Sequence, residues 1–494
     1  MSQGTRRELL RDAGIAAGGL ALLGASAPPA GAADGFAAPT AAALRELARR
    51  VAGTVVTPRA AGYDRARRLA QGAYAPRPAA VVLARGVADV QATARWAAER
   101  DVRLVARSGG HGFAGWAGGD PRTVVLDLGR LRAVGVQDGL AVVGAGAQLI
   151  DAYAGLARRG VAIPGGTCPS VGFGGLALGG GVGPSVRGLG LTSDRIRRAR
   201  VVTVDGRLRT LSGGDDLLWA MKGGGGGQLA ILVDAHLEPA PARRATWFAL
   251  TWPWSSADAA IDAWQRTIPT ADPRLSSTLS LLAGGAPRVR AIGEWHGTDA
   301  AALRRALGPL LRVPGARLSS GVDGRLDLQR RWAGCLGLSQ AACHTVGSRP
   351  GGRMPRETWA ATSDYLARPL DAAGRRILRE RVVARGARSG AIILDALGGA
   401  VRDGDGSFAH RAAIAQIQHY AQPGAAGLAA ARAWVRGNRA ALRGRTTGGA
   451  YVNYPDPGLR GFRSAYYGAS LARLRAVRRD VDPDRRLRFP QDVG

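Results

Sequence analysis

The chain of 494 residues is long enough for two or three domains, and it has ample apolar content for their cores. Its formal charge of +31 comes almost entirely from arginine, because Lys222 is the only lysine and the arginines are spread along the chain. No aromatic-and-basic stripe, zinc-finger spacing or recognition-helix pattern accompanies this charge, so we predict that the protein does not bind nucleic acid.

Residues 1–32 resemble an export signal. Arg6 and Arg7 form a twin-arginine start, residues 13–27 are small and apolar, and Ala30 to Ala32 offers a cleavage site of the A-x-A kind. The apolar stretch is too short to span a bilayer, and we find no longer one later in the chain. The sequence therefore predicts a secreted, extracytoplasmic protein that meets the twin-arginine translocase and has no transmembrane span.

A βαβ pattern follows a first helix predicted over residues 41–52. Strands are predicted at 79–84, 102–106 and 124–128, with a helix at 87–100 between the first two. A glycine loop, RSGGHGFAGWAGGD at 107–120, interrupts this pattern directly after a strand. Its backbone N–H groups could cradle a pyrophosphate, although the loop does not read G-x-G-x-x-G.

A second glycine-rich stretch, PGGTCPSVGFGGLALGGGVG, occupies residues 164–183. Glycine is costly to hold in one conformation, so such density favours close approach of the backbone to a ligand. A flexible linker is the alternative, but apolar residues such as Val171, Phe173 and Leu176 recur through the stretch as in a packed segment. We interpret this stretch as a backbone surface that lies against a bound ligand.

His111 and Cys168 lie in these two glycine-rich segments, 57 residues apart. A histidine between glycines is more often a solvated turn residue, but the two together offer nucleophiles from two exposed backbones. They make a poor zinc site because no Cys-x-x-Cys or second histidine is near, and we predict no metal. Covalent attachment of an organic cofactor needs only one nucleophile at each point.

Two further cysteines, Cys335 and Cys343, lie eight residues apart in a loop-like segment. They could close a small disulfide in an oxidising compartment, or both could remain thiols, and the sequence leaves the two possibilities open. In either case Cys168 is available for other chemistry.

The composition changes near residue 242, where strand-like runs begin to alternate with helices such as the one predicted over 300–311. Four tryptophans gather at the start of this region. They could stack on sugar rings or a flat aromatic substrate, or they could pack in an ordinary core. The four are Trp247, Trp252, Trp254 and Trp264. Near the C-terminus, residues 451–454 look strand-like and residues 470–479 are predicted to form a basic helix.

Several motifs together resemble those of the berberine-bridge-enzyme type of FAD-linked oxidases, within the vanillyl-alcohol-oxidase or PCMH-type superfamily. The resemblance runs from about residue 74 to the C-terminus. It is carried by RSGGH at 107–111, GGTC at 165–168, GGGVG at 179–183, DLLWA at 216–220 and YVNYPD at 451–456. Two departures, Gln228-Leu229-Ala230 and Leu189 in place of a frequent tyrosine, bear on substrate recognition more than on flavin binding.

The resemblance implies an α+β fold in which a two-part FAD-binding domain is joined to a substrate domain with an antiparallel sheet covered by helices. The implied boundaries are 40–241 for the FAD-binding domain, 242–448 for the substrate domain, and 449–494 for a segment that returns to the first domain. FAD would be attached bicovalently, through its 8α carbon to His111 and its C6 to Cys168. The other implied cofactor-binding residues are Arg107, Ser108, Gly109, Gly110, Gly112, Gly166, Thr167, Val171, Gly172, Gly174, Gly175, Gly179, Gly180, Gly181, Gly183 and Asn453.

The resemblance also implies catalytic roles near the C-terminus. Tyr454 corresponds to the base, Tyr451 to a more structural partner, and Gln418 to a residue that faces the substrate and can only orient it. An unperturbed tyrosine is a poor base at neutral pH, so its phenol would have to be acidified by positive charge or hydrogen bonds.

The implied function is an oxidase acting on an alcohol or hemiacetal group of a sugar, an oligosaccharide or a bulky natural product. Hydride would pass to flavin N5, and O₂ would be reduced to H₂O₂. The alternatives are a dehydrogenase that uses another acceptor, an intramolecular oxidative cyclase, and a basic binding protein without redox activity.

Overall fold

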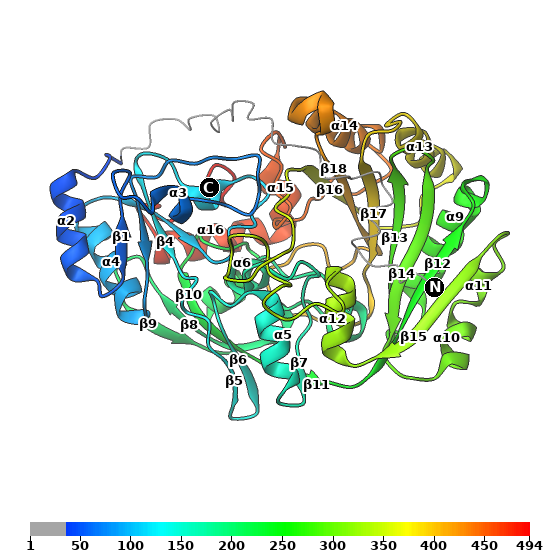
Figure 1. Ribbon diagram of the computed structural model, residues 1–494, viewed down its shortest axis with the longest axis horizontal. Coiled ribbons are helices and arrows are strands. Elements are labelled where there is room, and N and C mark those ends of the chain that lie inside the picture. The colour runs from blue at the N-terminus through cyan, green and yellow to red at the C-terminus, as the bar shows by residue number, and fades with distance from the viewer. Residues whose placement is uncertain (1–35) are drawn as a thin grey trace.

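The computed structural model describes residues 36–494, so the predicted signal segment, residues 1–32, lies outside the described residues. Two halves lie side by side in Figure 1: two smaller sheets with their helices on the left, and one large sheet on the right. No helix of the described part of the chain is long and apolar enough to cross a membrane.

A four-stranded sheet with the order β1-β2-β4-β3 opens the first half. Strands β2, β4 and β3 run parallel, and β1 is antiparallel to β2. Its strands are β1 (Thr54–Val56), β2 (Ala80–Leu83), β3 (Arg103–Arg107) and β4 (Thr123–Asp127), and its helices are α2 (Ala41–Arg50), α3 (Tyr63–Ala66) and α4 (Val87–Glu99). The glycine loop that carries His111 follows β3, at the carboxyl end of a parallel strand.

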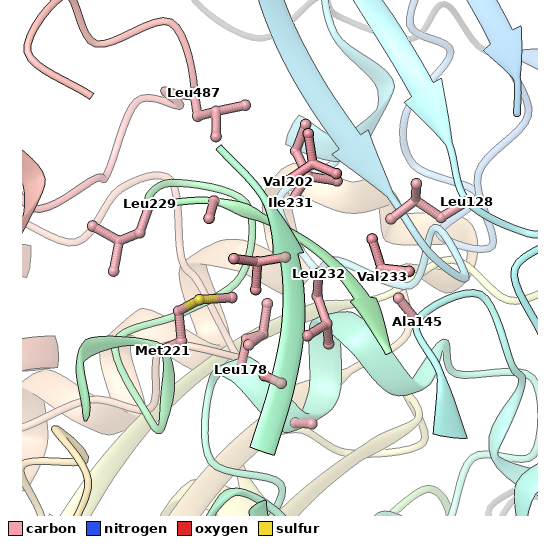
Figure 2. Packing of buried hydrophobic residues seen from close by; sticks show 14 of the residues in the cluster. Leu128, Ala145, Leu178, Val202, Met221, Leu229, Ile231, Leu232, Val233 and Leu487 are labelled. Carbon is pink, nitrogen blue, oxygen red and sulfur yellow. The ribbon is translucent and has the colours of Figure 1, made fainter. Parts of the chain in front are cut away.

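A five-stranded antiparallel sheet with the order β5-β6-β10-β8-β9 completes the first half. Its strands are β5 (Val134–Gln137), β6 (Leu140–Gly144), β8 (Ile196–Val202), β9 (Leu208–Leu211) and β10 (Ile231–Leu237). All residues of β10 are buried. Figure 2 shows side chains from distant segments, including Leu178, Met221 and Leu487, gathered around this strand. The core therefore joins the glycine-rich stretch to the C-terminal segment.

Short helices link these strands and carry the glycine-rich stretch. They are α5 (Leu149–Ala157), α6 (Phe173–Leu178), α7 (Val186–Leu189) and α8 (Asp216–Met221), and a small ribbon pairs β7 (Val161–Ala162) with β11 (Ala240–Pro241). Near the C-terminus, α15 (Phe462–Tyr467) and α16 (Leu471–Val481) return to the first half, where Leu474 and Val477 enter its core.

The second half is built on a seven-stranded antiparallel sheet with the order β15-β12-β14-β13-β17-β18-β16. Its strands are β12 (Ala245–Trp252), β13 (Leu275–Ala283), β14 (Arg288–Trp295), β15 (Arg317–Asp323), β16 (Ala360–Leu366), β17 (Gly390–Ala396) and β18 (Ala415–Ala421). Its helices are α9 (Ala257–Thr267), α10 (Ala300–Ala306), α11 (Gly308–Leu311), α12 (Arg325–Ala333), α13 (Ala372–Val383) and α14 (Gly427–Ala441). Alternate strand residues such as Leu279, Ile392 and Ile417 pack under α9, α13 and α14.

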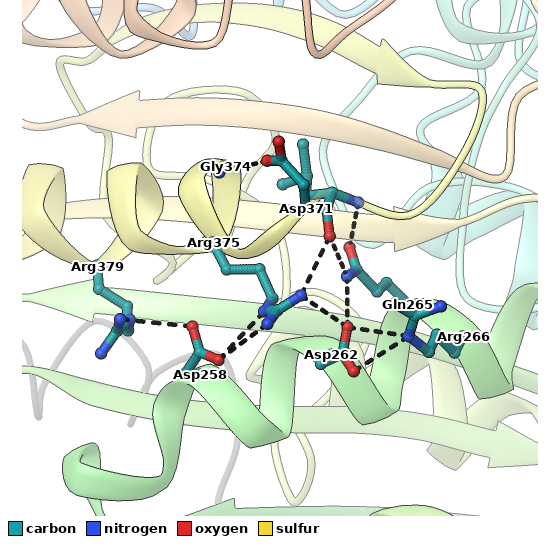
Figure 3. Close-up of polar contacts among 9 residues, drawn as sticks. Asp258, Asp262, Gln265, Arg266, Asp371, Gly374, Arg375 and Arg379 are labelled. Atoms are coloured by element: carbon teal, nitrogen blue, oxygen red, sulfur yellow. Dashed lines mark hydrogen bonds and ion pairs between the residues drawn. The ribbon is translucent and has the colours of Figure 1, made fainter.

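Ion pairs tie two of these helices together. Arg375 of α13 donates to Asp258 at 3.1 Å and to Asp262 at 2.8 Å, both on α9, and Arg379 pairs with Asp258 at 3.4 Å (Figure 3). Gln265 extends the contact by donating to Leu370 O at 2.9 Å. Helices α9 and α13 thus cover one face of the sheet, and the opposite face is left to line a cavity.

The α+β fold class predicted from the sequence is confirmed. The expected helix over 300–311 is divided into α10 and α11 at Gly308-Pro309, because proline cannot continue the hydrogen bonding of a helix interior. The expected strand over 451–454 is wrong. The segment forms a turn in which Tyr454 N donates to Tyr451 O at 2.8 Å. The domain boundaries stay predictions.

Candidate active site

A cavity of about 1440 Å³ opens between the glycine-rich loops of the first half and the seven-stranded sheet. Pockets for drug-sized ligands usually measure 300–1,000 Å³, so this cavity has room for a dinucleotide-sized group and a second molecule. The sheet lines it with the alternate residues that do not pack under the helices. These include Ser276, Thr278, Ser280, Arg290, Ile292, Ile393, Asp395, Gln418 and Tyr420.

The two glycine-rich loops interlock backbone to backbone. A Cβ atom placed on Gly109 would lie 2.3 Å from Gly172 N, and one on Gly172 would lie 2.2 Å from Gly109 N. Ser108 adds a hydrogen bond from its hydroxyl to Ala145 O. These two glycines are therefore required where the loops touch, and their contact brings His111 and Cys168 to one cavity.

His111 and Cys168 both line that cavity, although 57 residues separate them in the sequence. Cys168 is partly exposed and lies outside the disulfide. The loop that carries it is fixed on both sides, because the Tyr153 hydroxyl donates to Gly166 O at 2.8 Å and Thr345 N donates to Ser170 Oγ at 2.6 Å.

Most of the residues expected to hold the cofactor lie in the cavity wall. They are Ser108, Gly109, Gly110, Gly112, Gly166, Thr167, Val171, Gly172, Gly174, Gly175, Gly183 and Asn453. At Gly112 and Gly175, a Cβ atom would meet no protein atom within 4 Å, so the backbone lies bare toward the cavity. Gly175 is also exposed while its neighbours Gly174 and Phe173 are buried.

Four of the expected cofactor residues do not appear in the wall of the cavity that the described residues form. Arg107 is buried and donates to Asp127 at 2.7 Å. Gly180 has a φ of +114°, while Cβ atoms on Gly179 and Gly181 would lie 2.1 Å from Asn453 Oδ1 and 2.2 Å from Thr192 Oγ1. These glycines permit tight packing behind the wall.

Tyr451 is held rigidly beside the cavity. Its phenol oxygen accepts hydrogen bonds from Gly181 N at 2.8 Å, Val182 N at 3.2 Å and Asn453 Nδ2 at 3.0 Å. Burial raises the pKa of Tyr451, and these donors oppose that shift only in part. Tyr451 therefore remains a neutral phenol and anchors the turn that carries Tyr454.

Tyr454 also lines the cavity, with its ring fixed by two neighbours. Phe113 stacks on it with centroids 4.7 Å apart and an interplanar angle of 11°, and Tyr451 meets it edge to face at 4.9 Å. Gln418 lines the cavity from β18. The structure thus brings Tyr454, Gln418, His111 and Cys168 to one cavity.

Sequence reasoning assigned no role to several residues that line the cavity. Asp395 of β17 accepts a hydrogen bond from Thr278 Oγ1 at 2.7 Å. Trp359 meets Phe113 edge to face at 5.3 Å and stacks on Tyr420 at 6.5 Å. Asp395 and Tyr420 belong to the segments 395–401 and 416–420, which resemble parts of the family's substrate domain in sequence. The alternation of β17 and β18 indicates which of their side chains face the cavity, and no local signal marks Trp359.

The four tryptophans near residue 250 are not part of the cavity wall formed by residues 36–494. Trp252 and Trp264 are buried in the core of the second half, and the Trp247 ring lies against the Arg331 guanidinium. Of the two uses left open for this cluster, packing is the one that the structure shows.

The two cysteines whose pairing the sequence left open form a disulfide, Cys335–Cys343. It lies at the base of a segment, residues 335–359, that crosses to the first half. His344 contacts Gln148 Oε1 at 2.5 Å and Asp151 Oδ1 at 3.1 Å. The far end of this segment, from Arg353 to Trp359, lines the cavity.

A buried carboxylate supports the wall next to this segment. Glu294 is fully buried and accepts hydrogen bonds from Arg325 at 3.1 Å and from the Trp332 indole at 3.3 Å, with His296 Nε2 at 2.8 Å. Burial pushes its pKa upward, but Arg325 and His296 outweigh that effect and hold the pKa at about 2. The charged carboxylate fixes Trp332, which lines the cavity.

The chemistry of the wall fits FAD. Bare backbone at Gly112 and Gly175 allows a flat ring system or a pyrophosphate to approach closely. An imidazole and a thiol lie in the same wall, and the remaining volume can admit a substrate.

Comparisons with known proteins agree with this geometry. Residues 78–212 match a family model described as FAD binding domain, and residues 450–494 match one described as Berberine and berberine like. An uncharacterized FAD-linked oxidoreductase, YgaK of Bacillus subtilis, is 28% identical over 90% of this chain and 97% of its own length.

A xylooligosaccharide oxidase of Thermothelomyces thermophilus is 28% identical, over 82% of this chain and 85% of its own length. The solved structure of a xylooligosaccharide oxidase from Myceliophthora thermophila, in complex with xylobiose, is 27% identical. It covers 92% of this chain and 99% of its own, with a TM-score of 0.82.

Fold, cavity and family matches together define an FAD-linked oxidoreductase. Within that class, the chain has an FAD-binding domain and a C-terminal berberine-like segment, and its fold is that of berberine-bridge-enzyme-like proteins.

Proposed function

We propose that the protein is an exported oxidase that uses bicovalently bound FAD to oxidise the anomeric hydroxyl of a sugar or oligosaccharide, with O₂ as acceptor and H₂O₂ as product. One observation carries the proposal: His111, Cys168, Tyr454 and Gln418 all line a single cavity. The similarity to xylooligosaccharide oxidases over more than four-fifths of the chain supports a sugar as substrate.

In this proposal, His111 holds the flavin at its 8α carbon and Cys168 holds it at C6, while the glycine wall lies against it. When bound, the flavin supplies the acceptor for the substrate's hydride and passes the electrons to O₂. Two points of attachment would let the cavity stay wide without loss of the cofactor.

Tyr454 would take the proton from the substrate's hydroxyl group. Its orientation is set by the Phe113 stack and by Tyr451, which three hydrogen bonds hold in place. The Gln418 amide can orient the substrate but cannot titrate. Trp359 and Tyr420, which stack on one another and line the cavity, add aromatic surface that suits the C–H groups of a sugar.

Export rests on the predicted signal at residues 1–32 and gains support from the disulfide Cys335–Cys343. Disulfides persist in oxidising compartments and are rare in the cytosol. Fusion of residues 1–32 to a reporter, with Arg6 and Arg7 changed to Lys in a matched control, would test this part of the proposal. Equal export of both fusions would exclude the twin-arginine route.

Covalent attachment is tested by colour. Protein denatured and precipitated from a flavin-replete host should stay yellow, His111→Ala and Cys168→Ala should each keep flavin through the remaining bond, and the double variant should lose it on denaturation. A colourless wild-type precipitate would disprove covalent attachment.

The reaction is tested by screening xylobiose and other oligosaccharides for H₂O₂ release. Tyr454→Phe should slow anaerobic flavin reduction by a factor of about 10² to 10⁴ while the flavin stays bound. Tyr63→Phe, at a buried tyrosine that donates to Pro78 O outside the cavity, is the matched control. Flavin reduction without H₂O₂ release would instead favour a dehydrogenase.

A further inference from the structure

Cys168 lies in a turn that packs against the start of α5. The turn is formed by residues 166–171, and we call it the Cys168 turn. The first N–H groups of a helix have no partner inside the helix. Two of those in α5 donate to the turn, Leu149 N to Val171 O at 2.9 Å and Ile150 N to Pro169 O at 3.0 Å. Both acceptors come after Cys168, so these bonds fix the C-terminal side of the turn.

The N-terminal side of the Cys168 turn is held by a side chain, that of Tyr153. Tyr153 lies one helical turn after Leu149 on α5, and its hydroxyl donates to Gly166 O at 2.8 Å. It exposes 7% of its surface. Burial raises the pKa of its phenol well above the usual value, so the hydroxyl keeps its proton and remains a hydrogen-bond donor.

The contact between Tyr153 and the chain just before the Cys168 turn is tight. A Cβ atom on Gly165 would lie 2.4 Å from the Tyr153 hydroxyl oxygen, but 3.3 Å from Tyr153 Cζ. Gly165 is not part of the cavity wall formed by residues 36–494. A methyl group at this position would therefore displace the phenol oxygen without entering the space assigned to FAD.

The segment that crosses between the two halves also holds α5 and the Cys168 turn. Gln340 Nε2 donates to Asp151 Oδ1 at 2.6 Å, and His344 Nε2 contacts the same oxygen at 3.1 Å. Thr345 N donates to Ser170 Oγ at 2.6 Å. Helix and turn are thus fixed to the same segment, which leaves the turn little freedom to adjust if the Tyr153 contact is lost.

We propose that Tyr153 is a positioning residue for the bond between Cys168 and the flavin, because its hydrogen bond to Gly166 O sets where the Cys168 turn begins. The inference rests on the bicovalent attachment in the proposed function. The new bond from Cys168 Sγ to flavin C6 replaces the S–H bond and the C6–H bond. The two protons and two electrons that leave go to O₂, which becomes H₂O₂. A displacement of about 1 Å can slow such a reaction about 10²-fold.

The first test uses colour and needs no activity. In a His111→Ala background only Cys168 can keep flavin through denaturation, so the colour of the denatured precipitate measures that bond alone. Adding Tyr153→Phe should lower this colour about tenfold or more, whereas adding Tyr63→Phe should leave it unchanged. Tyr63 is the matched control, because its buried hydroxyl also donates to a backbone carbonyl, that of Pro78.

The second test shows whether the Tyr153→Phe protein is folded. In a Cys168→Ala background His111 alone holds the flavin, and adding Tyr153→Phe should leave that flavin in place. Peptide mapping of the single Tyr153→Phe variant by mass spectrometry should find flavin on the His111 peptide and little on the Cys168 peptide. Loss of flavin from both peptides would show that Tyr153 supports the fold as a whole, and would overturn the inference.

The third test follows bond formation in time. Flavin-free protein with His111→Ala, from a flavin-depleted host, is mixed with FAD in air, and denatured samples are read by absorbance. Tyr153→Phe and Gly165→Ala should each slow attachment about 10- to 100-fold. Together they should slow it no more than Tyr153→Phe does alone, because the hydroxyl that the new methyl group would displace is already absent. Two effects that multiply would contradict the contact.

Failure of this inference can be distinguished from failure of the proposed function. A colourless His111→Ala precipitate would show that Cys168 forms no bond to flavin, and would overturn the bicovalent attachment together with the role of Tyr153. Equal colour and equal rates of attachment in the Tyr153→Phe and Tyr63→Phe proteins would refute only the role of Tyr153.

Discussion

Gly175 provides the sharpest test of the idea that the glycine-rich part of the cavity wall binds a ligand. It lies inside α6, where replacing glycine by alanine normally stabilises a helix by about 0.5–1 kcal/mol. Its Cβ would meet no protein atom within 4 Å, so Gly175→Ala should make the flavin-free protein more stable. The same methyl group projects into the space assigned to FAD, so flavin content should fall.

Gly109→Ala is the opposite case. Its Cβ would lie 2.3 Å from Gly172 N and 2.9 Å from Ser170 O, both backbone atoms that cannot move aside. We expect the fold to lose about 3 kcal/mol or more, as in severe overpacking. Thermal unfolding of flavin-free protein and the absorbance of denatured samples measure the two effects. A less stable Gly175→Ala variant with full flavin content, or a fully stable Gly109→Ala variant, would refute the reasoning.

Three further changes test the surroundings of the site. Tyr451→Phe leaves three donors without their acceptor and should lower the free energy of unfolding by about 2–4 kcal/mol, measured by urea titration, while flavin stays attached. Burial, together with the positive charges of Arg439 and Arg381, lowers the pKa of His419 to about 3 in the folded protein. In the unfolded state the pKa is about 6.5, so as the pH falls the unfolded state takes up the proton before the folded state does. Stability should drop between these values, and His419→Leu should flatten that part of the urea-measured profile; an unchanged slope would contradict the assignment. Replacing Cys335 and Cys343 by Ser should speed proteolysis within residues 335–359; equal rates would show that the disulfide does not restrain the segment.

The sequence alone predicted the parts of the fold that depend on local signals. The βαβ pattern appears as β2, α4, β3 and β4 within a few residues of the predicted bounds, because hydrophobic period and helix length are local properties. The two glycine-rich loops, with His111 and Cys168, also stood out in composition.

The tertiary structure decided what each of these residues does. Gly109 and Gly175 both lie in glycine-rich segments, and the sequence does not distinguish their roles. Gly109 is needed for contact between two loops, whereas Gly175 leaves space in the cavity wall. Residues 451–454 look like a strand but form a turn, because hydrogen bonds to the distant Gly181 and Val182 anchor Tyr451.

Register and long-range packing decided the remainder. Thr278 and Asp395 stand opposite one another only because β13 and β17 pair in one register, which no single strand encodes. Trp359 reaches the cavity through a segment that crosses between the halves, whereas Trp264 is buried in the core. Residue type and spacing thus identified the loops that carry the chemistry, while contacts between segments far apart in the chain determined which side chains face the cavity.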